Sequence, residues 1–151
     1  MNIHVSDKLS QVKDKRIPLR MRIMKICVEE IIPSKLPNTV RFSTEFGNAL
    51  AFWEGDAPVT NCKYHVEVDI NDILVWDKDI IAIKDTGNYS IREENNCVSI
   101  IGDLESVDDD GYSIIKFGES IIPFMTTGKP FQVGTFIKIT TKSIFLSPVT
   151  Y

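Results

Sequence analysis

The sequence predicts a mainly β protein built from two successive five-stranded units of one plan, with a short basic segment in front. Ile and Val recur throughout the 151 residues, whereas Ala occurs only four times. This bias favours strands, because β-branched side chains lose less freedom on a pleated sheet than in a helix. Apolar and polar residues alternate in several segments, as expected for half-buried strands. The order of apolar positions and turns in residues 46–75 also returns in residues 117–146.

Residues 1–18 form the predicted N-terminal arm, which is helical or irregular. Ser6 is suited to cap a short helix, and Pro18 separates the arm from the first predicted strand. Residues 1–25 carry seven basic and two acidic side chains, a charge of +5, which leaves −9 for the rest of a chain whose net charge is −4. Only this arm has the sign that a phosphate-binding surface requires.

The first unit is expected to span residues 19–78. Alternation starts at Leu19 and slips by one residue after Ile23, which suggests a β-bulge in a long bent strand. The following strands are residues 40–46 and 49–53 around a Gly47-Asn48 turn, then residues 66–70, then residues 73–76 after a turn at Asn71-Asp72.

Residues 79–94 are expected to form a connecting hairpin, and residues 95–151 a second unit. The connecting hairpin would turn at Thr86-Gly87, and the second unit opens at Cys97 with its first turn at Asp110-Gly111. The alignment that sets Phe46 on Phe117 also sets Trp53 on Phe124, and it keeps the apolar positions in step over about thirty residues. The sequence therefore predicts an internal repeat.

The run from Phe131 to Ile139, FQVGTFIKI, leads to a last strand from Ile144 to Ser147. A Val-Gly step entering a fourth strand and a fifth strand ending in Leu-Ser resemble the oligonucleotide/oligosaccharide-binding (OB) family. The resemblance implies two tandem five-stranded Greek-key barrels that bind single-stranded nucleic acid on aromatic side chains. The connectors at residues 55–63 and 126–134 lack the helical period that the family shows there. A small sandwich or another small barrel therefore remains an alternative.

Residue types that support catalysis or metal binding are not grouped along the chain. Cys27, Cys62 and Cys97 are too far apart for a zinc site or a disulfide framework, and His4 and His65 are isolated. A calcium loop with its glycine at position 111 would begin at Ser and end at Phe, where carboxylates are needed. We expect no enzyme, metal or cofactor. With no signal peptide and no span of about 18 apolar residues, we also expect a cytoplasmic protein.

Our first functional hypothesis is a non-catalytic protein-binding module with an acidic surface, such as a bacterial immunity protein that neutralises a basic nuclease toxin. The candidate partner-binding residues are Asp103, Glu105, Asp108, Asp109, Asp110 and Trp76. Trp53 is expected in the core, and Trp76 either in the core or at the surface.

Two alternatives remain open from the sequence. The first is binding of single-stranded nucleic acid by the tandem barrels, for which the basic candidates are Lys13, Lys15, Arg16, Arg20 and Arg22. The second is an accessory or structural subunit of phage or plasmid origin, whose second barrel docks through a sheet edge.

Overall fold

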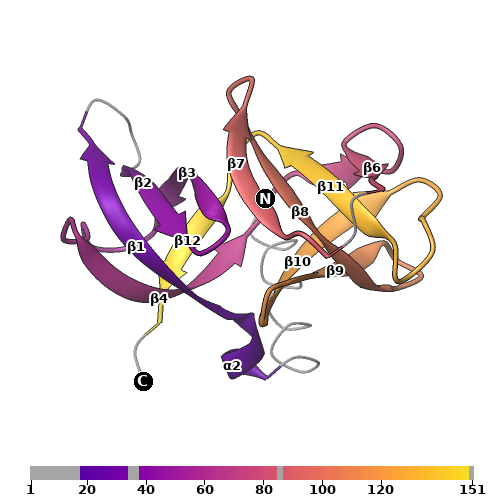
Figure 1. The fold of residues 1–151 in the computed structure, drawn as a ribbon, viewed down its shortest axis with the longest axis horizontal. Helices are drawn as coiled ribbons and strands as arrows, with labels where there is room; N and C mark the ends of the chain where they lie inside the picture. Colours follow the sequence, from indigo (N-terminus) through magenta and orange to yellow (C-terminus); the bar gives the residue numbers. More distant parts are fainter. Residues whose placement is uncertain (1–17, 34–37, 85–86, 150–151) are drawn as a thin grey trace.

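The protein is mainly β in the computed structural model, which describes residues 18–33, 38–84 and 87–149 (Figure 1). The mainly β prediction is therefore confirmed. The expected arm at residues 1–18 lies almost wholly outside the described residues. The elements are α2 (Leu19–Arg22), β1 (Ile23–Ile32), β2 (Thr39–Thr44), β3 (Gly47–Trp53), β4 (Cys62–Asp69), β5 (Ile73–Val75), β6 (Ile80–Ala82), β7 (Ser90–Glu94), β8 (Cys97–Val107), β9 (Tyr112–Phe117), β10 (Ser120–Thr127), β11 (Phe136–Thr141) and β12 (Phe145–Pro148).

Five strands close into a barrel in the order β1-β2-β3-β12-β4. All of its pairs are antiparallel except β3 with β12, which run parallel. This ring is compatible with an OB-like barrel. As the sequence predicted, no helix occupies the connector between β3 and β4.

Six of the other strands pair in the order β5-β10-β9-β8-β11-β6, which we call the second ring. β5 runs parallel to β10, and one isolated bridge joins Trp76, the residue after β5, to Ile80, the first residue of β6. β7 pairs with β8 and contacts β3 at Gly47, so it connects the two rings (Figure 1).

These pairings correct the expected division into residues 19–78 and 95–151. The closed barrel takes its last strand, β12, from the end of the chain, and β5 leaves the first half to pair with β10. Asn71-Asp72 is therefore not a hairpin turn, because β5 does not pair with β4 in the described sheet. The expected hairpin at residues 79–94 is also wrong: β6 pairs with β11, and β7 pairs with β8.

The two hairpins that the predicted repeat makes equivalent match with an offset two residues different from the expected alignment. The β2–β3 hairpin closes at Thr44 opposite Gly47, and the β9–β10 hairpin closes at Phe117 opposite Ser120. Thr44 is therefore the structural equivalent of Phe117, where the sequence alignment placed Phe46. An alignment that is wrong by two residues still places each side chain on the correct face of the sheet, because side chains along a strand alternate with a period of two.

One connector contact is also repeated. The amide of Asn61 donates to Val28 O at 2.7 Å, and the amide of Gly134, its counterpart in the second half, donates to Leu104 O at 2.8 Å. Both residues have positive φ, at 59° and 96°. Each connector thus enters its next strand by the same hydrogen bond to the long strand.

A β-bulge does bend each long strand, but not where the alternation slips. The register shifts between Val28 and Glu30 in β1, and between Leu104 and Ser106 in β8. The extra residue is a glutamate both times, at positions 29 and 105. The slip after Ile23 instead marks the point where the helical turn α2 ends and β1 begins.

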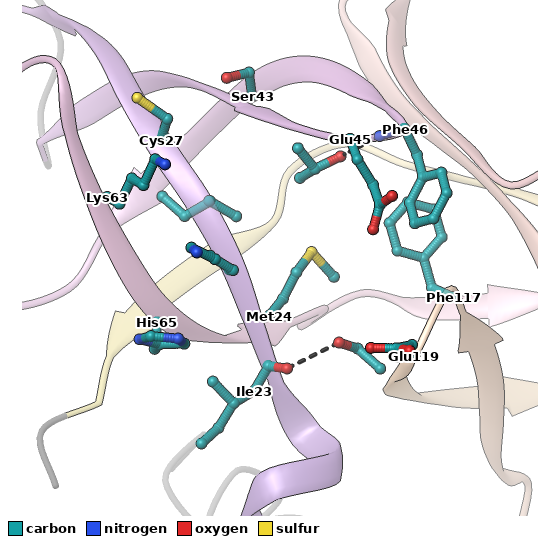
Figure 2. Close-up of a pocket in the computed structure, with 14 residues that line it drawn as sticks. Ile23, Met24, Cys27, Ser43, Glu45, Phe46, Lys63, His65, Phe117 and Glu119 are labelled. Carbon is teal, nitrogen blue, oxygen red and sulfur yellow. Dashed lines mark hydrogen bonds between the residues drawn. The ribbon is translucent and has the colours of Figure 1, made fainter.

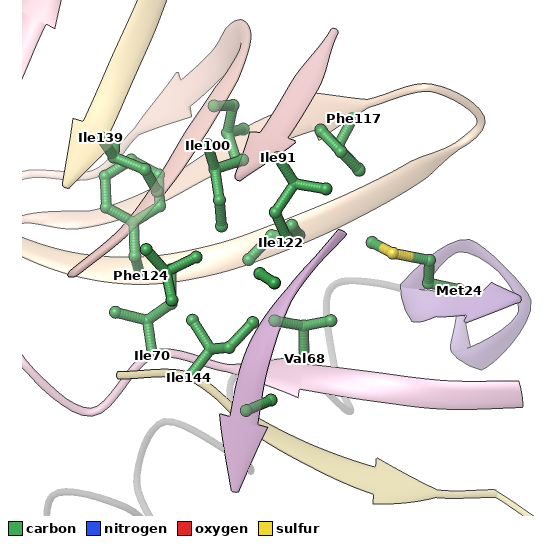
Figure 3. Close-up of a cluster of buried hydrophobic side chains, with 14 of the residues drawn as sticks. Met24, Val68, Ile70, Ile91, Ile100, Phe117, Ile122, Phe124, Ile139 and Ile144 are labelled. Carbon is green, nitrogen blue, oxygen red and sulfur yellow. The ribbon is translucent and has the colours of Figure 1, made fainter. Parts of the chain in front are cut away.

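One hydrophobic cluster runs through both rings (Figure 3). It includes Ile70 and Ile144, which are 2% and 0% exposed, and Trp53 at 3%. Trp76 is 5% exposed and packs edge-on against Phe131, with ring centroids 5.1 Å apart. Both tryptophans are therefore core residues.

Candidate binding surfaces

The β8–β9 turn presents carboxylates from a well-ordered hairpin. The Asp108 amide donates to Tyr112 O at 2.8 Å, and the Gly111 amide donates to Asp108 O at 3.0 Å. Gly111 has φ 94°, a conformation that costs glycine little. Asp110 Oδ1 accepts from the Tyr112 amide at 3.2 Å. The backbone of this turn is therefore specified by its own hydrogen bonds.

The structure brings most of the predicted acidic residues to this turn. Glu105, Asp109 and Asp110 are exposed, whereas Asp108 is half-buried. We call these four residues the acidic hairpin. Its three exposed carboxylates form no salt bridge with a cation in the described part of the chain.

Two of the predicted partner-binding residues lie apart from the acidic hairpin. Asp103 is half-buried on β8, directly opposite Lys116 of β9 and Phe136 of β11. Trp76 is a core residue, so its prediction as a contact residue is wrong. Its place at a strand end suggested exposure, but the β10–β11 connector covers it with Phe131.

The basic residues predicted for nucleic acid are not gathered on a described surface. Lys13, Lys15 and Arg16 lie outside the described residues, as does the side chain of Arg20. Arg22 is only 7% exposed and forms an ion pair with Glu67 of β4. Arg22 is therefore corrected from a surface contact to a structural ion pair.

A groove of about 710 Å³ runs along the outer side of β1 (Figure 2). It is bordered on one side by β4 and on the other by the β2–β3 and β9–β10 turns. Ser120 Oγ of the second ring donates to Ile23 O at 2.8 Å, which holds the β9–β10 turn against β1. The groove therefore lies where the two rings meet.

The β1–β4 side of this groove carries three basic side chains, which we call the basic block: Lys25, Lys63 and His65. Lys25 is directly opposite His65, and Cys27 is directly opposite Lys63. The three basic side chains are exposed. Neither lysine forms a salt bridge with a described carboxylate. Lys25 and Lys63 give this side of the groove a positive charge, which favours a bound anion.

The other side of the groove is acidic and aromatic. Glu45 and Glu119 are exposed on the two facing turns, and Phe46 is half-buried. The Phe46 ring packs edge-on against Phe117 at 5.1 Å and Tyr89 at 5.3 Å. Figure 2 shows Phe46, Phe117 and Glu119 on the side away from Lys63 and His65. The groove thus has two halves of opposite charge.

Sequence reasoning did not find the basic block. The alternation of β1 and β4 does indicate that Lys25, Lys63 and His65 point away from the core. However, nothing local indicates that β1 and β4 pair in the register that places Lys25 opposite His65. The sequence therefore indicated that each of these side chains points outward, but not that the three lie close together.

Side chains of the kinds that bind metals are not grouped in the part of the chain that the structure describes. No group of three or more His, Cys, Asp or Glu side chains there is placed to hold a metal ion. Cys27, Cys62 and Cys97 are half-buried free thiols. No described helix has the length and apolarity needed to cross a membrane.

The chain was compared with known protein families, curated proteins and solved structures. No protein-family model, no curated protein and no solved structure matches the chain.

Proposed function

We propose that the protein is a non-catalytic binding module whose acidic hairpin docks onto a basic protein partner. The observation that supports this most is the set of three exposed carboxylates without a described cation partner: Asp109 and Asp110 on the hydrogen-bonded turn, and Glu105 at the bulge of β8 that leads into it. Because the turn is already ordered, little conformational entropy is lost when a partner binds.

The chemistry of the hairpin specifies the kind of partner. Carboxylates accept paired hydrogen bonds from arginine, and a cluster of them speeds the approach of a cationic surface. A nuclease toxin exposes such a surface in its phosphate-binding cleft. The proposal is therefore an inhibitor of the immunity-protein kind, acting in the bacterial cytoplasm.

We also propose that both rings are OB-like barrels from one duplicated plan. The strand order of the closed barrel, the matching bulges and the equivalent β2–β3 and β9–β10 hairpins support this. On this proposal the acidic hairpin is the turn between the first and second strands of the second barrel.

The test compares two triple variants of equal charge change. Glu105→Gln, Asp109→Asn and Asp110→Asn neutralise the hairpin, and the amide introduced by Asp110→Asn still offers an oxygen acceptor to the Tyr112 amide. The control, Glu29→Gln, Glu54→Gln and Asp56→Asn, neutralises three exposed carboxylates of the first half.

Basic proteins that co-purify with the wild type are identified, and association rates are measured at several salt concentrations. The hairpin variant should associate roughly tenfold more slowly at low salt, and the control should behave as wild type, because steering depends on local charge. Equal rates for both variants would refute the choice of surface.

The basic block supports a second candidate function, the binding of single-stranded nucleic acid in the groove. Lys25 and Lys63 would contact phosphates there. The tryptophans are buried, so the measurement is anisotropy of a labelled oligonucleotide rather than tryptophan quenching. The double variant Lys25→Gln/Lys63→Gln should bind the oligonucleotide more weakly and with a smaller dependence on salt. The matched control, Lys84→Gln/Lys129→Gln, should bind as wild type does. No binding by wild type at low salt would exclude this function.

A further inference from the structure

Two equivalent strands of this chain occupy each other's places. β12 lies in the first barrel between β3 and β4, and β5 lies beside β10 in the second ring. Leu146 is opposite Trp53 in the parallel β3–β12 pair, and Leu74 is opposite Thr126 in the parallel β5–β10 pair. Trp53 and Thr126 are equivalent positions when the two hairpins are superposed by their closing pairs. β5 and β12 are therefore the fifth strands of the two units, exchanged between them.

The exchanged strands are firmly held. Leu74 and Leu146 are 2% and 0% exposed. The Phe52 and Glu54 amides donate to the carbonyls of Ile144 and Leu146 at 2.9 and 3.0 Å. Both strands thus contribute a buried leucine and ladder hydrogen bonds to the half that did not supply them.

The links that lead into the exchanged strands are short and lie against each other. Residues 70–72 join β4 to β5, and residues 142–144 join β11 to β12. Asp72 Oδ2 accepts from Thr141 Oγ1 at 2.9 Å and from the Lys142 amide at 3.1 Å. Asp72 therefore ties one crossing link to the other.

The crossing also explains why β5 does not fold back on β4 as a hairpin. Ile70 and Ile144 lie in the links and belong to the shared hydrophobic cluster (Figure 3). Folding each strand back into its own unit would require both links to turn sharply.

We propose that the two halves of the chain, residues 1–87 and 88–151, are obligate ligands of each other. Each half has a slot for a fifth strand that the other half fills. The first half also gives β6 to β11, and the second gives β7 to β3. The protein therefore folds and unfolds as one unit and remains whole when the connection between its halves is cut.

The first test cuts the folded, full-length protein. A protease site is inserted after Gly87, which is exposed and has open space where a Cβ would lie. After cleavage the two fragments should elute together at the intact mass and unfold in a single transition that coincides for near- and far-ultraviolet circular dichroism. Fragments that separate without denaturant, or two separate transitions, would overturn the proposal.

The second test distinguishes exchanged strands from a merely adhesive interface. With Cys27, Cys62 and Cys97 replaced by Ser, Ile73→Cys is combined either with Met125→Cys or with Phe52→Cys. Ile73 is directly opposite Met125 in the exchanged arrangement. It would be opposite Phe52 if β5 took the place of β12, where Phe145 now lies. Neighbouring strands bring opposite residues within disulfide range.

The expected result is a disulfide only in the Ile73→Cys/Met125→Cys chain. After cleavage at residue 87, that disulfide should keep the two fragments in one band on a denaturing, non-reducing gel. A disulfide that forms in the Phe52→Cys chain instead would show unexchanged barrels and overturn the proposal.

Discussion

Removing the Asp72 carboxylate should destabilise the whole protein, because it ties the two crossing links. Asp72→Ala deletes the acceptor of two hydrogen bonds, one of them from the hydroxyl of Thr141, which is 2% exposed. A hydrogen bond to a charged group contributes about 1.5–3 kcal/mol. However, Thr141 Oγ1 also lies 3.3 Å from Ser143 O and can donate there instead. We therefore expect a loss of about 1–2 kcal/mol, smaller than the full value of two such bonds.

Denaturant unfolding and thermal melting measure this loss. For a chain of this size the expected loss lowers Tm by about 2–8 °C. Asp72→Asn should lose less than half as much, since both donors use one oxygen, which the amide keeps. Asp56→Ala, at an exposed loop carboxylate, should stay within about 0.5 kcal/mol of wild type. An Asp72→Ala protein as stable as the Asp56→Ala control would refute the role of the crossing.

Three further predictions concern single residues. Leu146→Ala should cost about 2–5 kcal/mol and lower the denaturation midpoint of both rings together, because this buried leucine of β12 belongs to a shared core. Gly102→Ala should cost about 1–3 kcal/mol in the same assay, since its Cβ would overlap the carbonyl oxygen of Lys116. The Lys138 ammonium, 2.6 Å from Glu94, lowers the pKa of that carboxyl from its ordinary 4.5. The ionised Glu94 therefore stabilises the folded state fully above pH 4.5, and this stabilisation is lost as the pH falls through the lowered pKa. Glu94→Gln should flatten the pH dependence of the free energy of unfolding below pH 4.5.

Local patterns predicted much of the strand content and the facing of side chains. The alternation in residues 66–70 predicted a half-buried strand, and β4 shows Val66 and Val68 buried. The Asp110-Gly111 turn lies between β8 and β9, as predicted. These features depend on residues two to four positions apart, so the chain specifies them without reference to its other parts.

Of the two candidate surfaces, local sequence patterns predicted one and missed the other. The acidic hairpin was predictable because Asp108, Asp109 and Asp110 are consecutive in a turn. The basic block was not, because Lys25 and His65 lie on strands that β2 and β3 separate along the chain, and they meet only through the β1–β4 register. Trp76 was ambiguous because its burial depends on Phe131, which comes from a different strand connection.

The sequence by itself determined a mainly β protein, the inward and outward faces of its strands, and one acidic turn. Only the tertiary structure decided that β12 lies beside β3 and β4, and that β5 lies beside β10. The reason is that β5 and β12 have equivalent apolar patterns and equally short links, so either slot satisfies their local preferences. The hydrogen bonds from Thr141 and Lys142 to Asp72 join the two links across the halves, so no local sequence pattern can specify them.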